Sequence, residues 1–97
     1  MIRIVACIAA LAAVFSVHAQ DSGRNLAAAC AICHGTDGRA VTKDVMPLAG
    51  LPREHIAQQM RAFRDGQRPA TVMHQIAKGY TDAQIDVLAA WFSALKR

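Results

Sequence analysis

The spacing of apolar residues predicts two well-defined helices in the second half of the chain. The later one follows the sequence Thr81-Asp82-Ala83-Gln84, which has the form of a capping box. Its apolar residues recur at three- and four-residue intervals: Ile85, Leu88, Ala89, Phe92 and Leu95. The earlier one is expected over residues 53–64, with Pro52 at its first position and Asp65-Gly66 as its stop. Its apolar stripe consists of Ile56, Met60 and Phe63.

Two further segments have weaker helical patterns. One is expected to begin at Ser22 as the N-cap and to end near His34-Gly35. The other covers residues 71–78, with Gly79 as a left-handed C-cap. Residues 36–51 contain glycines and a proline without a sustained period, which predicts a long loop. Because no segment alternates apolar and polar residues, we predict an all-α fold.

Residues 1–19 have the organisation of a cleavable secretory signal peptide. A short positive start, Met1–Arg3, precedes an apolar run of 14 residues over 4–17, and Ala19 is a small residue that signal peptidase accepts. A membrane-spanning helix needs about 20 residues, so a retained anchor is the weaker alternative. We expect a cleaved leader, no stable membrane anchor, and one periplasmic domain over residues 20–97.

Charge and length argue against nucleic-acid binding and indicate that the domain needs a stabilising group. The formal net charge is +4, but the basic residues neither cluster nor alternate with aromatic residues, so we expect no nucleic-acid interface. A domain of this length buries too little surface to rely on its core alone, and a metal, a cofactor or cross-links usually stabilise such a chain. A disulfide between Cys30 and Cys33 would close too small a loop to do so.

The sequence Cys30-Ala31-Ile32-Cys33-His34 is the attachment signature of c-type haem. Two thiols at this spacing add across the vinyl groups of the porphyrin, and the following histidine presents an imidazole nitrogen to iron. A thioredoxin-like pair would need a βαβ context, and a zinc site would need a second, closely spaced pair of ligands. We predict one covalently bound haem c, with Cys30 and Cys33 as thioether residues and His34 as the proximal iron ligand.

The second axial position of the iron distinguishes an electron carrier from a site that binds gas or activates oxygen. Met73 is the preferred ligand, because it lies 39 residues after His34 on a short segment that can cover the opposite haem face. A thioether favours ferrous iron, so a His/Met pair raises the reduction potential. Met46 and His74 remain alternative ligands, whereas Met60 is expected to be a core residue and His55 a solvated one.

Three sequence blocks resemble those of class I cytochromes c. They are Cys30 to Gly38, Met46 to Leu51 and Thr71 to Asp82. More narrowly, the chain from about Ala28 to its end is similar to the haem subunit of flavocytochrome c sulfide dehydrogenase and to related c4-type cytochromes with one haem. This resemblance implies a small class I cytochrome c fold of about four helices wrapped around one haem.

The resemblance also implies roles for two residues. In the family, a proline carbonyl accepts a hydrogen bond from the proximal imidazole, and Pro47 takes the matching place, which would fix the tautomer and orientation of His34. However, Leu48-Ala49-Gly50 follows Pro47 one residue sooner than the commonest spacing. The methionine before Ile-Ala-x-Gly-Tyr is the distal ligand of the family, which matches Met73.

The function implied is transfer of single electrons without catalysis by this chain. The expected donor is an FAD-containing sulfide dehydrogenase subunit, and a second protein would accept the electrons downstream. Arg61, Arg64 and Arg68 could steer docking. A free-standing soluble cytochrome is the alternative in the same class, and a haem-based gas sensor is the alternative in another.

Overall fold

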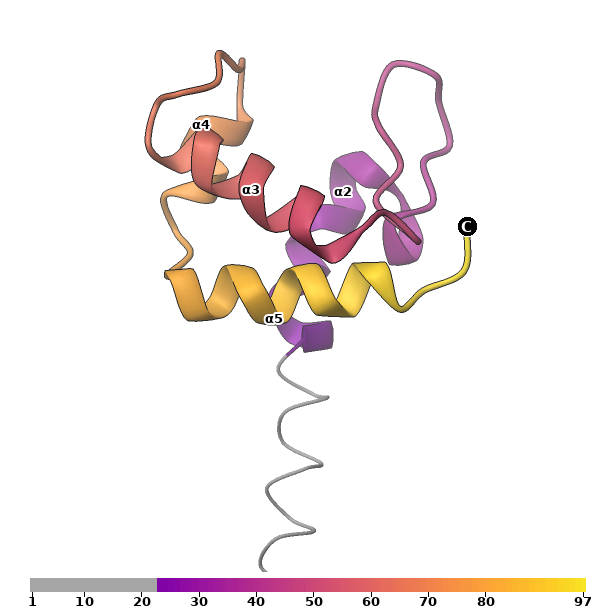
Figure 1. Ribbon diagram of the computed structural model, residues 1–97. Coiled ribbons are helices and arrows are strands. Elements are labelled where there is room, and N and C mark those ends of the chain that lie inside the picture. The colour runs from indigo at the N-terminus through magenta and orange to yellow at the C-terminus, as the bar shows by residue number, and fades with distance from the viewer. Residues whose placement is uncertain (1–22) are drawn as a thin grey trace, which may run out of the picture.

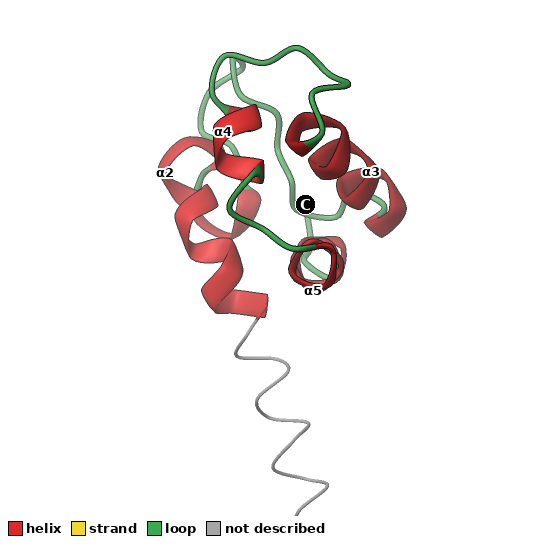
Figure 2. Ribbon diagram, turned by 90° about the vertical axis from the view of Figure 1, so that its left-hand side faces the viewer, coloured by secondary structure: helices red, strands yellow, loops and turns green. Residues whose placement is uncertain are grey.

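The computed structural model describes residues 23–97, and every regular element in that range is helical (Figures 1 and 2). The predicted leader, residues 1–19, and the expected N-cap Ser22 lie outside the described residues. The elements are two short 3₁₀ helices, Ala28–Cys30 (η1) and Thr36–Gly38 (η2), and the α-helices Ala31–His34 (α2), Arg53–Arg64 (α3), Met73–Ala77 (α4) and Asp82–Ser93 (α5). From residue 23 onward, no helix has both the length and the apolar character needed to cross a membrane.

The N-terminal helical segment ends where the sequence predicted. Residues 23–27 are α-helical, η1 tightens the next turn, and α2 continues to His34. Gly35 follows with φ of 84°, and a Cβ there would lie 2.0 Å from the carbonyl oxygen of Arg39. Only a glycine fits this turn, which ends α2 directly after the haem-attachment sequence.

The core lies where α3 packs against α5 (Figure 1). Ile56, Ala57 and Met60 are buried on α3, which confirms most of the predicted stripe, while Phe63 packs at its edge. The largest fully buried side chains all belong to α5: Ile85, Leu88 and Phe92. Burial of such side chains contributes about 1.5–3 kcal/mol each, so this pair of helices carries most of the apolar stabilisation.

The ends of α3 and α5 follow the local sequence signals, except at Pro52. The capping box is present: Gln84 N–H donates to Thr81 Oγ1 over 3.2 Å, and Thr81 N–H donates to Gln84 Oε1 over 3.0 Å. Asp65 caps the end of α3 as expected. Pro52 is the N-cap of α3 rather than its first residue, because its ψ of 134° is not helical.

The short helix α4 differs from its prediction at both ends. It covers Met73–Ala77 instead of residues 71–78, and Gly79 is not in the left-handed conformation. Gly79 N–H donates to Ile76 O and Tyr80 N–H donates to Ala77 O, both over 3.1 Å. These tight i→i+3 bonds satisfy the last carbonyls, so no left-handed residue is needed.

The loop predicted over residues 36–51 begins instead after η2, at residue 39, and it is tied to α5. The carbonyl of Gly38 accepts hydrogen bonds from Leu48 N–H (2.8 Å) and Ala49 N–H (3.1 Å), and Gly50 N–H donates to Phe92 O (2.9 Å). A Cβ on Gly38 would lie 2.9 Å from the Phe92 ring. The loop therefore has a fixed base on the core helix.

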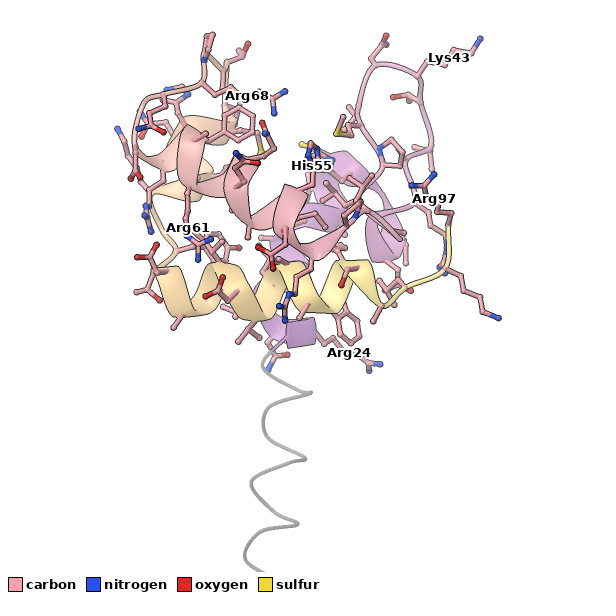
Figure 3. All side chains as sticks on the ribbon, viewed as in Figure 1. Arg24, Lys43, His55, Arg61, Arg68 and Arg97 are labelled. Carbon is pink, nitrogen blue, oxygen red and sulfur yellow. The ribbon has the colours of Figure 1, made fainter. Side chains whose placement is uncertain are left out.

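A cluster of ion pairs joins α3 to the start of α5. Arg61 reaches Asp82 (3.2 Å) and Asp86 (2.6 Å), and Arg64 reaches Asp82 (2.8 Å) and Asp65 (3.0 Å). Figure 3 shows Arg61 between the two helices. The guanidinium of Arg64, and to a lesser extent that of Arg61, holds the pKa of Asp82 below its usual range.

Candidate functional site

A cavity of about 440 Å³ brings the predicted site residues together. It opens between the N-terminal segment, the loop, α3 and α4, and its walls are mostly apolar. The residues of the attachment sequence that line it are Cys30, Cys33 and His34, and the other candidate ligands on its walls are Met46, His55, Met60 and Met73. The walls of a single cavity thus include two thiols, two imidazoles and three thioethers.

The two cysteines lie at the wall of this cavity as free thiols. Cys33 is exposed and Cys30 is half-buried. Burial raises the pKa of the Cys30 thiol, and its backbone hydrogen bond opposes this effect. Ile32, between them, is 88% exposed, so the attachment sequence lies at the molecular surface rather than inside the core.

The imidazole of His34 is oriented by a main-chain carbonyl. Its Nδ1 lies 2.7 Å from the carbonyl oxygen of Met46. Because a carbonyl oxygen can only accept, Nδ1 carries the hydrogen in this pair, and Nε2 keeps its lone pair. A hydrogen bond of this kind is the usual partner of a metal-binding histidine.

The prediction that Pro47 supplies this acceptor is wrong by one residue. In the commonest family spacing, one residue separates the proline from Leu-Ala-Gly. Met46 occupies that place here, and its carbonyl oxygen is the acceptor. The two hydrogen bonds from Leu48 and Ala49 to Gly38 O fix the loop after Pro47, and the carbonyl before the proline is the one that faces His34. The shortened spacing was the sequence signal for this shift.

Met73 enters the cavity from the first turn of α4, 39 residues after His34 in the sequence. It is half-buried and packs against the core. The other methionines differ in setting: Met60 is 7% exposed within the core cluster, whereas Met46 is 53% exposed on the loop. His74 does not line the cavity, and its buried Nδ1 has no hydrogen-bond partner within the described chain.

The three arginines expected to steer docking have different surroundings. Arg61 and Arg64 are in the ion pairs with Asp82, Asp86 and Asp65, so the chain itself compensates their charges. Arg68 is in no ion pair within residues 23–97, and it lines the cavity. This difference was not predictable from the sequence, because it depends on how α5 lies against α3.

Comparison with known proteins decides the family. No family model matches the chain. The cytochrome subunit of sulfide dehydrogenase from Chlorobaculum tepidum is 39% identical over 80% of this chain and 70% of its own length. Cytochrome c-554(548) from Halomonas halodenitrificans is 33% identical over 75% of this chain and 92% of its own length. The chain belongs to the c-type cytochromes.

This cytochrome is also similar to an electron-accepting protein and to a solved cytochrome c4 structure. A thiosulfate dehydrogenase electron acceptor from Thiomonas intermedia is 44% identical over 72% of this chain, and this chain spans 33% of its length. The solved structure of Acidithiobacillus ferrooxidans cytochrome c4 superposes with a TM-score of 0.72 at 35% identity, over 79% of this chain and 49% of that one. The predicted class I cytochrome c fold is confirmed.

The residues present fit the cofactor of this family. An apolar cavity with two thiols at Cys-x-x-Cys spacing and an imidazole whose Nε2 is free matches the chemistry of a covalently bound haem c. Together with the relatives, these residues make the protein a c-type cytochrome electron carrier with haem c. Sequence reasoning missed the Met46 carbonyl and the wall formed by Gln59 and Arg68, both of which depend on contacts between distant segments.

Proposed function

We propose that this cytochrome is the electron-accepting haem subunit of a periplasmic sulfide dehydrogenase. The observation that carries the proposal is the single cavity that joins Cys30, Cys33 and His34 to Met73. It is supported by the similarity to the sulfide dehydrogenase cytochrome subunit over most of both chains. Residues 1–19 would direct export and be removed, which would deliver the thiols to the compartment where disulfides and covalent haem bonds form.

Each site residue has a defined task in this proposal. Cys30 and Cys33 would hold the porphyrin through thioethers, and His34 Nε2 and the sulfur of Met73 would bind its iron. Met46 O holds the His34 ring in the required tautomer. The bound haem supplies a reversible one-electron change at iron. The His/Met pair favours the ferrous state and so suits a chain that accepts electrons.

The surface near the cavity offers a route for a partner. Ile32, Met46 and Val72 are all exposed apolar side chains, and the last two line the cavity. A redox partner that covers this region would bring its own cofactor near the haem edge without displacing core residues. We propose an FAD-containing subunit as the donor and a second electron-transfer protein as the downstream acceptor.

The test is direct reduction of the purified holoprotein. A flavin-containing sulfide dehydrogenase subunit with sulfide should reduce the haem in a stopped-flow experiment, and affinity capture of the tagged cytochrome from its native cells should recover a flavin-bearing chain. The control omits sulfide. Rapid reduction by a thiosulfate dehydrogenase but not by the flavoprotein would contradict the sulfide assignment.

A second candidate has its own supporting observation. The similarity to the thiosulfate dehydrogenase electron acceptor favours a carrier that serves thiosulfate oxidation, or several donors, as a free monomer. Sedimentation of the protein from native extract separates the cases, because a subunit migrates with its flavoprotein and a free carrier migrates at its own mass.

The proposed export has a separate test. Intact-mass analysis of the protein from the periplasm should show a chain that begins at Gln20 and carries one haem. A chain that retains Met1, or one recovered only with membranes, would show that the leader is kept as an anchor.

A further inference from the structure

Arg68 is the only lysine or arginine among the residues that line the cavity. It follows the end of α3 in a loop, and its backbone N–H bonds back to the carbonyl of Ala62 over 3.2 Å. An exposed arginine of this kind usually extends its guanidinium into solvent. Its side chain, however, turns towards the cavity wall instead of standing free in solvent.

Two neighbours hold the guanidinium in place. Its central carbon lies 4.6 Å from the centroid of the Phe63 ring, a cation–π contact, and its Nη1 donates to Gln59 Oε1. Phe63 and Gln59 also line the cavity. A guanidinium has five N–H donors, and this contact uses one, so the group is positioned while most of its donors remain available.

The charge of Arg68 also lacks a carboxylate partner within residues 23–97. Arg61 and Arg64, on α3, are paired with aspartates, whereas no carboxylate among residues 23–97 lies within ion-pair distance of Arg68. A fixed, uncompensated guanidinium at a cavity wall is suited to bidentate recognition of a carboxylate.

Haem c is itself amphipathic, because two propionate carboxylates extend from one edge of an otherwise apolar ring. The cavity offers partners of both kinds. Its walls are mostly apolar, with Cys30 and Cys33 as thiols, while His55, Gln59 and Arg68 contribute polar side chains. Figure 3 shows Arg68 and His55 on the side of α3 away from α5. The acidic lining residue Asp44 comes from the loop that also carries Lys43.

We propose that Arg68, positioned by Phe63 and Gln59, binds a haem propionate. This inference rests on the proposed function, because it requires haem attached at Cys30 and Cys33. A cation beside the propionate also favours the reduced, less positive iron state. Arg68 is a positioning residue whose loss should change both the propionate and the potential.

The test uses the holoprotein and the variants Arg68→Gln and Arg68→Lys. In resonance Raman spectra, the propionate bending band should move to lower frequency in Arg68→Gln, because the propionate loses a strong hydrogen bond. The reduction potential should fall in the same variant. Arg68→Lys should keep most of the potential but not the full band position, since an ammonium retains the charge without the planar fork.

Arg53→Gln is the matched control, because it also removes one arginine charge, but Arg53 lies on α3, pairs with Glu54 and does not line the cavity. It should leave the band unchanged. An unchanged band in Arg68→Gln, or an equal shift in Arg53→Gln, would overturn the inference. A wild-type protein without the spectrum of covalently bound haem would instead overturn the proposed function. If Arg68→Gln holds too little haem to measure, Gln59→Leu tests the same contact and should give a smaller shift in the same direction.

Discussion

At the scale of single residues, the imidazole of His34 and the sulfur of Met73 are prepared in different ways. The hydrogen bond to Met46 O sets the tautomer of His34 before any metal binds, so this ligand needs little reorganisation. Met73 has no such partner and is positioned by packing at the start of α4. In the proposed coordination, substitution of Met73 would remove the iron–sulfur bond and leave the hydrogen bond that orients His34 in place.

The variant Met73→Ala should abolish the far-red charge-transfer band that marks methionine-bound ferric haem, and it should lower the reduction potential. The physical reason is the loss of a soft ligand that favours ferrous iron. Optical spectroscopy and redox titration measure both changes. Met46→Ala is the control, since it keeps the carbonyl that His34 uses; loss of the band in this control instead would assign the ligand to Met46. If wild-type protein lacks the band and binds carbon monoxide readily, the protein is a gas sensor.

At the scale of elements, local signals predicted the helices better than they predicted the turns. The capping box at Thr81 and the stop at Asp65 depend on residues within one turn, so the sequence contained the required information. A local rule predicted the conformation of Gly79, and the family spacing predicted the role of Pro47. Hydrogen bonds decide both places instead: Gly79 N–H donates to Ile76 O, and the two residues after Pro47 donate to Gly38 O. The haem-attachment sequence was recognisable from its motif, whereas the wall around Arg68 depends on the packing of α3, the loop and α4.

The ion pairs between α3 and α5 predict a pH-dependent stability. The Asp82 pKa is lowered from an ordinary value of 3.8, so its contribution is complete well above pH 3.8 and is lost as the pH falls through the lowered value. Asp82→Asn should lower the melting temperature at neutral pH, and the difference from wild type should vanish in acid. Thermal unfolding by circular dichroism measures this.

Glu54→Gln is the control for this experiment. It removes the same charge from the first turn of α3, where Glu54 pairs with its neighbour Arg53 rather than with another helix. Its effect on the melting temperature should be smaller at neutral pH. A difference between Asp82→Asn and wild type that persists unchanged in acid would refute the role of this carboxylate.

At the scale of the whole molecule, the cavity is large relative to the core. Few large side chains are fully buried, and they are concentrated on α5. Atoms that line an apolar cavity of about 440 Å³ have no van der Waals partners on that side unless a ligand fills it. The haem is thus expected to supply the missing half of the core, as small domains commonly require.

The double variant Cys30→Ala, Cys33→Ala should fail to retain haem and should lose most of its native helicity, because the loop and α4 then have little to pack on. Far-UV circular dichroism of the purified chain provides the measurement. Ile32→Ala is the control, since this side chain is 88% exposed and both thiols remain. Full native helicity in the double variant would show that the polypeptide folds without its cofactor.

The acceptor for His34 has an evolutionary consequence. Because it is a main-chain oxygen, nearly every substitution at position 46 preserves it, and the following Pro47 limits how far that peptide can rotate. The side chain at position 46 can then vary with the needs of a partner while the ligand geometry stays constant. A cytochrome built in this way can acquire new electron donors without retuning its proximal ligand.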